Sequence, residues 1–543
     1  MLHRDLPFGL ARSRGHAEPF FDGQPPNSLK SHFRQLTGSK SSRIRVNNVS
    51  QDHPDSEETL PEDVIVIIFG YLTVGELMVV RRCSKWFKHL SQNRQLWINF
   101  ISHPYFPASA SAPLLDDLSH HALENLVRRQ FELSRTWSPK KSNASPIPIR
   151  RAYRLSMPNN ESLTAMSSMD SWVAVASDLG GVYVCAPFGS DIERRAKWIR
   201  MVSVPVEINK LSVAVWHVSG REHVAVMWAG RLSVALQFQC GLVYAAVEDL
   251  VNAQDCAQGR IVLSTSDFVS SSTMQLRNPA SEIMDIALGD RFCAVVDAAH
   301  IMQAFMHRNS GGEPIDPSNR SEFQGEYRSS RKTISLQFLP GDQLLFQSDS
   351  FIAVYKPDSL DSSDMATKFI TRLPSTHYFG LLGQRQSSTI PFAFDHMTVP
   401  LLALTENGAE ITHFDVRLAS SDVESAGAND YGFSYRRSAS YLLASWMRPF
   451  SLGAINGGYS RLVWITSSEG QPFGIALGRL CPGNGDPALS YETQLNPTEL
   501  DLGKYKEALV EHAPSGPLFA FHQGEGKLLG GVRGVPDLFM MEY

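Results

Sequence analysis

From about residue 151 onward, the sequence repeats one small pattern: a short apolar strand, a tight turn, a second apolar strand, a turn and a third strand. The clearest copy is IMDIALGDRFCAVVDAAHIMQAFM at 283–306. Further copies occupy 168–187, 211–238, 334–357, 394–415, 452–478 and 514–531. Apolar runs separated by Gly, Asp, Asn and Ser are typical of strands. A sheet this small buries its faces only by packing on neighbouring copies, so the pattern indicates a repeat architecture.

The spacing of the copies narrows the choice of fold. Their central strands are expected to begin at Val173, Val224, Ala294, Leu344, Leu401, Leu462 and Leu518. Successive starts lie 50 to 70 residues apart, and the longest step spans 239–282, which could hold an insertion or an extra blade. Seven units at this spacing favour an all-β propeller over 151–543, with seven blades expected. A pair of packed β-sandwich sheets is the competing architecture.

Residues 60–97 have a different period. Apolar residues recur every three or four positions, which predicts three short amphipathic helices in succession, the last ending at Leu96 and Trp97. Thr59 or the acids before it could cap the first helix, with Pro61 in the first turn, where proline is favoured. Thr73 stands three residues before Glu76, which is the spacing of a capping box for the second helix.

The remaining segments complete the expected domain organisation. A spacer helix is predicted over about 119–135, so that the helical module covers 56–137, and an extended linker follows at 138–150. The leader 1–55 is rich in Ser, Gly, Pro and Arg and has no sustained periodicity. We expect it to be a solvated, disordered segment, with a nuclear-import or anion-binding tail as the alternative.

The segment LPEDVIVIIFGYLTVGELMVVRRCSKWFKHLSQNRQLW at 60–97 closely resembles the F-box, a small helical module. The resemblance covers under a tenth of the chain, and nearly all anchors of the family pattern are present in order. It implies binding to the Skp adaptor protein, which docks on a cullin scaffold. The residues expected to bind the adaptor are Leu60, Pro61, Val64, Ile67, Ile68, Leu72, Leu77, Val80, Trp86, Leu96 and Trp97.

A physical argument also predicts a partner for this module. A three-helix unit this short cannot bury all of these apolar side chains by itself, so its helices need a second apolar surface. We expect Ile68 and Leu72 near the centre of the adaptor-binding surface, with Leu60 and Pro61 beside them. The alternative is that the same side chains pack against the propeller or the spacer helix.

The propeller weakly resembles the regulator-of-chromosome-condensation family. The copy at 283–306 follows that family's scheme of strand, Gly, strand, turn and strand. Most copies lack the family's His after the Gly and its closing Gly, so nucleotide-exchange activity is not carried over. The resemblance therefore concerns architecture alone.

Composition and missing motifs argue against several functions. Lys plus Arg total 50 against 55 Asp plus Glu, a formal charge of −5, so we expect no nucleic-acid partner. No apolar run is long enough to cross a bilayer and no signal peptide is evident, so no membrane partner is expected either. Cytoplasm or nucleus, or both, is the expected location.

Catalytic and metal-binding signatures are absent from the sequence. It contains no GxSxG, HExxH, Walker loop or CxxC, so we expect no enzyme activity, cofactor or metal. Its six cysteines are expected to be buried free thiols. His120 and His121 are adjacent on a predicted helix and are expected to point apart, which argues against paired metal ligation.

Together these features predict a substrate-recognition adaptor of a Skp–cullin–F-box ubiquitin ligase. The F-box would bind the Skp adaptor and cullin complex, and the propeller would bind a protein substrate that the sequence does not name. Two alternatives are an F-box scaffold that acts outside a ligase and a propeller-based exchange factor with an accessory helical module.

Overall fold

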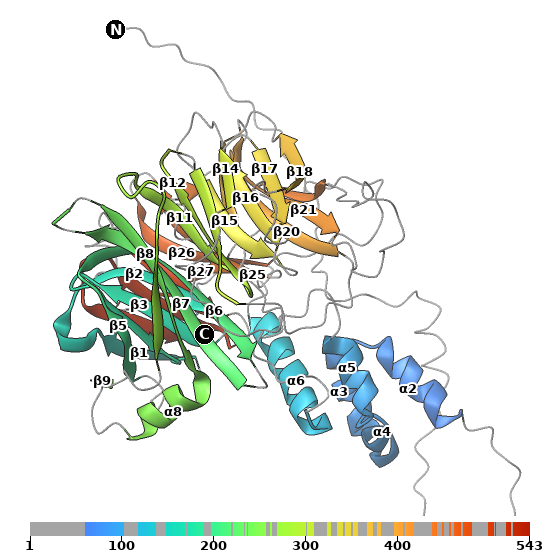
Figure 1. Ribbon diagram of the computed structural model, residues 1–543. Coiled ribbons are helices and arrows are strands. Elements are labelled where there is room, and N and C mark those ends of the chain that lie inside the picture. The colour runs from blue at the N-terminus through green and yellow to red at the C-terminus, as the bar shows by residue number, and fades with distance from the viewer. Residues whose placement is uncertain are drawn as a thin grey trace, which may run out of the picture. The chain divides into compact units, whose positions relative to one another are not determined.

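The computed structural model describes residues 60–101, 118–136, most of 148–308 and, between 323 and 543, the strands with a few adjoining residues. The chain divides into two compact units: a helical unit drawn from residues 1–100 and 119–131, and a strand unit drawn from the rest (Figure 1). The expected leader 1–55 and all but the last residues of the expected linker 138–150 lie outside the described residues.

In the described residues, five helices contribute to the helical unit, and two of them continue beyond it at their C-terminal ends. They are α2 (Glu62–Gly70), α3 (Val74–Cys83), α4 (Lys85–Leu90), α5 (Arg94–Ile101) and α6 (His120–Thr136). The expected third helix is therefore two helices, because a turn follows Leu90 and the Asn93 side chain accepts a hydrogen bond from the Gln95 amide as α5 begins. Side chains that cap a new helix in this way end the preceding one.

Two helix starts test the sequence-based expectations. The capping box of α3 is confirmed: Glu76 N–H donates to Thr73 Oγ1 at 3.2 Å, and Thr73 N–H donates to Glu76 Oε2 at 3.0 Å. Pro61, by contrast, is the N-cap residue of α2 and does not lie in its first turn, which holds Glu62 and Asp63. The acids are in the position that the helix dipole favours.

The strand unit consists, in the described residues, of seven sheets of four or five strands. The first three hold β2 (Leu163–Met169), β3 (Trp172–Ser177), β4 (Gly181–Cys185), β5 (Trp198–Ser203) and β9 (Ile261–Val262); β6 (Val206–Val218), β7 (Arg221–Leu232), β8 (Phe238–Ala246) and β10 (Ser270–Met274); and β11 (Ile283–Leu288), β12 (Phe292–Asp297), β13 (Ile301–Met306) and β14 (Phe323–Glu326). A 3-10 turn, η2 (Pro158–Asn160), precedes the first sheet.

The other four sheets continue in chain order. They hold β15 (Ile334–Leu339), β16 (Gln343–Ser348), β17 (Phe351–Lys356) and β18 (Ala366–Arg372); β19 (His377–Leu381), β20 (His396–Thr405), β21 (Gly408–Arg417) and β22 (Arg437–Leu442); β23 (Arg448–Pro449), β24 (Asn456–Gly457), β25 (Arg461–Ser468), β26 (Gln471–Arg479) and β27 (Thr498–Leu500); and β28 (Pro517–His522), β29 (Lys527–Val532), β30 (Asp537–Glu542) and β1 (Arg151–Ser156).

The sheets follow one another around a closed path. Strand β6 packs on β2 and on β11, β11 packs on β15, and β15 packs on β19. The fifth sheet contacts the sixth through β21 and β23, the sixth contacts the seventh through β24 and β28, and β28 returns to β2. This cyclic packing of small sheets makes the unit propeller-like, as the repeat spacing predicted. The number of blades stays a prediction.

Successive side chains of one strand serve two different cores. In β3, Ala174 and Ala176 pack toward the second sheet, whereas Val173 and Val175 pack toward the seventh. In β7, alternate residues likewise divide between the first and third sheets. Because side chains alternate across a strand and both faces are covered, these strands have continuous apolar sequences.

The structure shows what occupies the longest interval between repeats, residues 239–282, and it corrects one strand assignment. Residues 239–282 hold β8, β10 and an inserted helix, α8 (Val247–Cys256), and in the described residues they form no additional sheet. The insertion is tied to the first sheet, because Lys197 Nζ donates to the Gln254 carbonyl oxygen at 2.8 Å and the Gln254 amide donates to the Lys197 carbonyl oxygen at 2.8 Å. The central strand expected at Leu518 is β28, which lies at the edge of its sheet.

The first and last strands of the strand unit meet in the seventh sheet. Strand β1 pairs antiparallel with β30, from Arg151 opposite Glu542 to Ser156 opposite Asp537. The Arg154 guanidinium and the Ser156 hydroxyl both donate to the Asp537 carboxylate. A propeller whose last sheet combines both ends of the repeat region has no open edge between its first and last sheets.

Candidate functional site

The interior of the helical unit fixes its short helices. Leu77, Leu96 and Trp97 are almost completely buried. The Trp97 indole N–H donates to the Ser91 carbonyl oxygen at 2.9 Å, which joins α5 to the turn after α4. Phe69 of α2 meets the ring of Phe87 in α4 edge-on, with centroids 5.9 Å apart. These contacts set the surface that the helices show outward.

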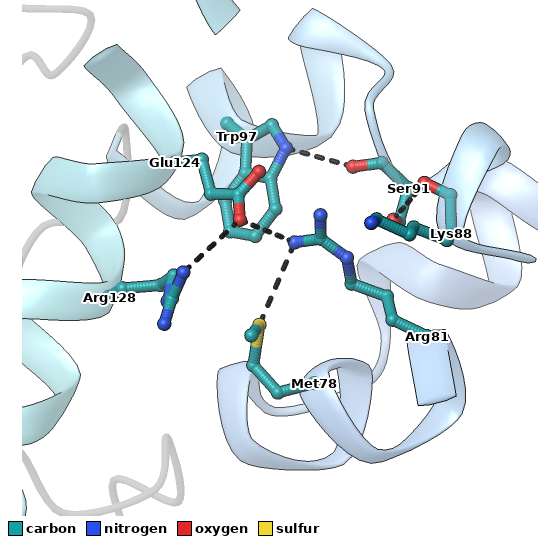
Figure 2. Close-up of polar contacts among 7 residues, drawn as sticks. All are labelled: Met78, Arg81, Lys88, Ser91, Trp97, Glu124 and Arg128. Atoms are coloured by element: carbon teal, nitrogen blue, oxygen red, sulfur yellow. Dashed lines mark hydrogen bonds and ion pairs between the residues drawn. The ribbon is translucent and has the colours of Figure 1, made fainter. Parts of the chain in front are cut away.

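A buried ion pair joins α3 to α6 (Figure 2). The Arg81 guanidinium donates to Glu124 Oε1 at 2.6 Å, and only 10% of the Arg81 side chain and 8% of the Glu124 side chain are exposed. Arg128, one turn further along α6, approaches the same Glu124 oxygen at 3.7 Å. The Arg81 guanidinium also lies 5.8 Å from the centre of the Trp97 ring. Four side chains from three helices are thereby held together.

Helix α2 has two apolar faces. Ile65 and Phe69 are buried, at 7% and 1% exposure. Val64, Ile67 and Tyr71 follow one another at helical spacing on another side of the helix, and Ile67 is 60% exposed. Successive residues are rotated by about 100° in an α-helix, which places these two stripes on nearly opposite faces. One face therefore packs inside the unit, and the other leaves Ile67 and Tyr71 exposed.

Among the described residues of the helical unit, large apolar side chains are exposed at five positions. We call them the open apolar surface: Leu60 (46% exposed), Ile67 (60%), Tyr71 (80%), Val79 (61%) and Trp86 (39%). The Trp86 indole N–H donates to Glu62 Oε1 at 3.3 Å, which ties α4 to the first turn of α2. Complete burial of one such side chain by a partner contributes about 1.5–3 kcal/mol.

The structure divides the predicted adaptor-binding residues into three groups. Leu60, Pro61, Ile67 and Trp86 are exposed; Val64, Ile68, Leu72 and Val80 are half-buried; and Leu77, Leu96 and Trp97 are buried. The buried group has no surface to offer a partner and supports the helices from inside. Ile68 and Leu72, expected at the centre, are half-buried, so the most open position on α2 is Ile67.

Three residues of this site are missing from the predicted adaptor-binding set. Tyr71 and Val79 are the most exposed apolar side chains of the open apolar surface. The sequence could have indicated them, because each lies on or beside a helix but outside the apolar stripe that the helix buries. Glu124 gave no signal, because its partner Arg81 is 43 residues away in sequence.

Two further expectations need correction. The rings of His120 and His121 do not point apart: their centroids lie 3.9 Å from each other. Of the four cysteines whose side chains the structure describes, Cys83 is exposed and not buried, whereas Cys185, Cys240 and Cys293 are buried free thiols as expected.

Titratable groups in the strand unit are engaged in its packing. Burial raises the pKa of the Cys185 thiol and that of the Cys293 thiol, which keeps both protonated. Burial also raises the pKa of Tyr183, whose hydroxyl donates to Glu161 at 2.9 Å. Within the described residues, no group of three or more His, Cys, Asp or Glu side chains could hold a metal ion. No helix in that part of the chain has the length and apolarity needed to cross a bilayer.

Comparison with known families identifies the helical segment. Residues 58–102 match the F-box-like family. This range covers α2 to α5 and therefore the whole of the open apolar surface. The chain thus has an F-box-like domain followed by a propeller-like domain of short strands.

Solved structures with a similar arrangement of strands are distant. The β-propeller domain of Cps50 (Swd1) from Myceliophteria thermophila is 13% identical with a TM-score of 0.41, and the match covers 72% of this chain and all of that one. YCF48 bound to a D1 peptide is 9% identical with a TM-score of 0.34, over 74% of this chain and all of that one. The computationally designed Ika8 protein is 10% identical with a TM-score of 0.32, over 72% and 98%.

These distant likenesses carry no functional argument. No curated protein matches the chain. The resemblance to the regulator-of-chromosome-condensation family is not confirmed by these comparisons.

Proposed function

We propose that this protein is a substrate-recognition adaptor of a Skp–cullin–F-box ubiquitin ligase and catalyses no reaction itself. The F-box-like helices bind the Skp adaptor, and the propeller-like domain binds the protein to be modified. Linking two binding sites in one chain raises the effective concentration of substrate near the ubiquitin-loaded enzyme. Cytoplasm or nucleus, or both, is the location that such a role requires.

The observation that carries the proposal is the open apolar surface within the F-box-like match. Ile67 of α2 and Tyr71, the C-cap residue of that helix, remain 60% and 80% exposed, although Ile65 and Phe69 on the nearly opposite face are buried. A soluble domain that keeps several large apolar side chains uncovered at one short module indicates a protein-binding site. F-box domains generally bind the Skp adaptor, which supports that adaptor as the partner of the F-box-like residues 58–102.

Binding of the full chain to a purified Skp adaptor tests the proposal. Ile67→Asp places a charge where an apolar contact is expected, so adaptor binding should fall at least a hundredfold, equal to about 2.7 kcal/mol. Leu179→Asp is the matched control, because Leu179 is 69% exposed in the turn after β3 of the propeller-like domain. It should leave adaptor binding unchanged. Failure of the unaltered chain to bind any Skp adaptor would overturn the proposal.

Co-purification with a cullin separates the ligase adaptor from an F-box scaffold. A ligase adaptor brings the cullin down together with the Skp adaptor, and Ile67→Asp removes both. Recovery of the Skp adaptor without any cullin, under conditions that recover a known ligase intact, would favour the scaffold. Substrates of the propeller-like domain are sought by the same purification with the proteasome inhibited.

A further inference from the structure

The second contact between α3 and α6 lies at the opposite end of α3 from the ion pair. A Cβ atom placed on Gly75 would lie 2.9 Å from Cζ of Phe131, so any larger residue there would displace the phenyl ring. Gly75 precedes Arg81 by six residues on α3, and Phe131 follows Glu124 by seven on α6. At about 1.5 Å of rise per residue, these separations are about 9 and 10.5 Å. The two helices therefore run antiparallel and touch over nearly two turns.

One face of α6 is buried. Leu123, Val127 and Gln130 are 0%, 1% and 3% exposed and repeat at helical spacing. Glu124, beside this stripe, is a carboxylate at 6% exposure whose partner is the Arg81 guanidinium. A charge that is removed from water remains stable only if its partner is in place, so the pair ties the position of α3 to that of α6.

We propose that α6 is an integral helix of the F-box module and that Glu124 is a positioning residue for the open apolar surface. Val79 of that surface lies on α3 between the two α6 contacts, Gly75 and Arg81. Arg81 in turn lies against Trp97 of α5. The geometry of the partner-binding surface therefore depends on residues 119–131, which lie outside the family match at 58–102. This inference rests on the proposed adaptor binding.

Variants of the full chain test the inference with two measurements. Glu124→Leu leaves the Arg81 guanidinium buried without its carboxylate, so amide hydrogen exchange in α3 and α5 should accelerate about tenfold or more. Affinity for the purified Skp adaptor should fall about tenfold or more in the same variant. Arg81→Met combined with Glu124→Leu replaces the ion pair by an apolar pair and should restore both quantities. Asn125→Ala, at an exposed neighbour on α6, is the matched control and should change neither.

The possible outcomes have distinct meanings. Faster exchange without loss of affinity would overturn the positioning role, because α6 would then stabilise the unit without setting its surface. No change in either quantity would overturn the whole inference. If Glu124→Leu unfolds the helices, Glu124→Gln carries the same test with a neutral acceptor. If the unaltered chain binds no Skp adaptor, the proposed function fails, and the exchange rates alone still decide whether α6 holds α3.

Discussion

The apolar run in α2 gives neighbouring side chains opposite roles. Ile65 and Phe69 are buried inside the helical unit, whereas Ile67 between them is 60% exposed. A substitution at Ile65 or Phe69 should therefore affect folding, whereas one at Ile67, only two residues away, should affect partner binding. Studies of this module need variants chosen by face and not by proximity in the sequence.

At the scale of single residues, the capping box of α3 gives a stability prediction. Thr73→Ala removes the oxygen that accepts from the Glu76 amide, so the free energy of unfolding of the helical unit should fall by about 1 kcal/mol. Glu76→Gln is the control, because glutamine can make the same reciprocal hydrogen bond. Urea denaturation followed by tryptophan fluorescence measures both variants. A loss for Glu76→Gln without any loss for Thr73→Ala would show that charge, and not the cap, is what stabilises this turn.

At the scale of helices and strands, the two domains differ in how many faces of an element are buried. Strand β3 of the propeller-like domain is buried on both faces, so its sheet depends on two neighbouring sheets. The F-box helices use one face for packing and leave the other open. Damage to one strand should spread around the sheets, while damage to an outer helix face should stay local.

Strand β3 provides the test of this difference. Val173 is completely buried between the first and seventh sheets, so Val173→Asp should lower the unfolding free energy of the propeller-like domain by about 4 kcal/mol or more. Adaptor binding by the helices should persist. Thermal unfolding paired with adaptor pull-down distinguishes this result from that of Ile67→Asp, which should give the reverse pattern. Loss of adaptor binding by Val173→Asp in a soluble protein would contradict independent domains.

Several elements could be predicted from the sequence because their signals are local. The α3 capping box depends on two residues three positions apart, and the strands follow from apolar runs between turn residues. The repeat spacing of the central strands also predicted the cyclic packing of the sheets. The strand order of the seventh sheet was harder to predict from the sequence, because one of its strands, β1, comes from the other end of the repeat region. The assignment of Leu518 to a central strand failed for that reason.

The candidate site was only partly predictable for related physical reasons. Every residue from Val64 to Phe69 is apolar, so periodicity could not tell the packed face of α2 from the open one. Leu96 and Trp97 would be apolar in the motif whether they bound the partner or packed inside the unit. Only their burial in the structure assigns them to the interior. The Arg81–Glu124 pair joins residues of separate helices, and a single sequence contains no signal for such a pair.

For the whole molecule, the domain organisation predicts a defined proteolytic pattern. The segment PKKSNASPIPIR at 139–150 precedes β1, whose strand pairing with β30 begins at Arg151. Limited proteolysis of the full chain should therefore leave a stable fragment that starts near residue 150. Mass spectrometry of the time course identifies its ends. One protected fragment over 60–543 would contradict separate modules, and early cleavage between β16 and β21 would contradict a closed propeller.

The pairing of β1 with β30 also sets the order in which this chain can mature on the ribosome. Ser156 and Asp537, which face each other in the last sheet, are 381 residues apart in the sequence. At translation rates of about 5–20 residues per second, β1 waits about 20 to 80 seconds for its partner strand. The F-box helices are synthesised before β1, so they can fold during that interval. Nascent chains should therefore become competent for the Skp adaptor before the propeller-like domain closes.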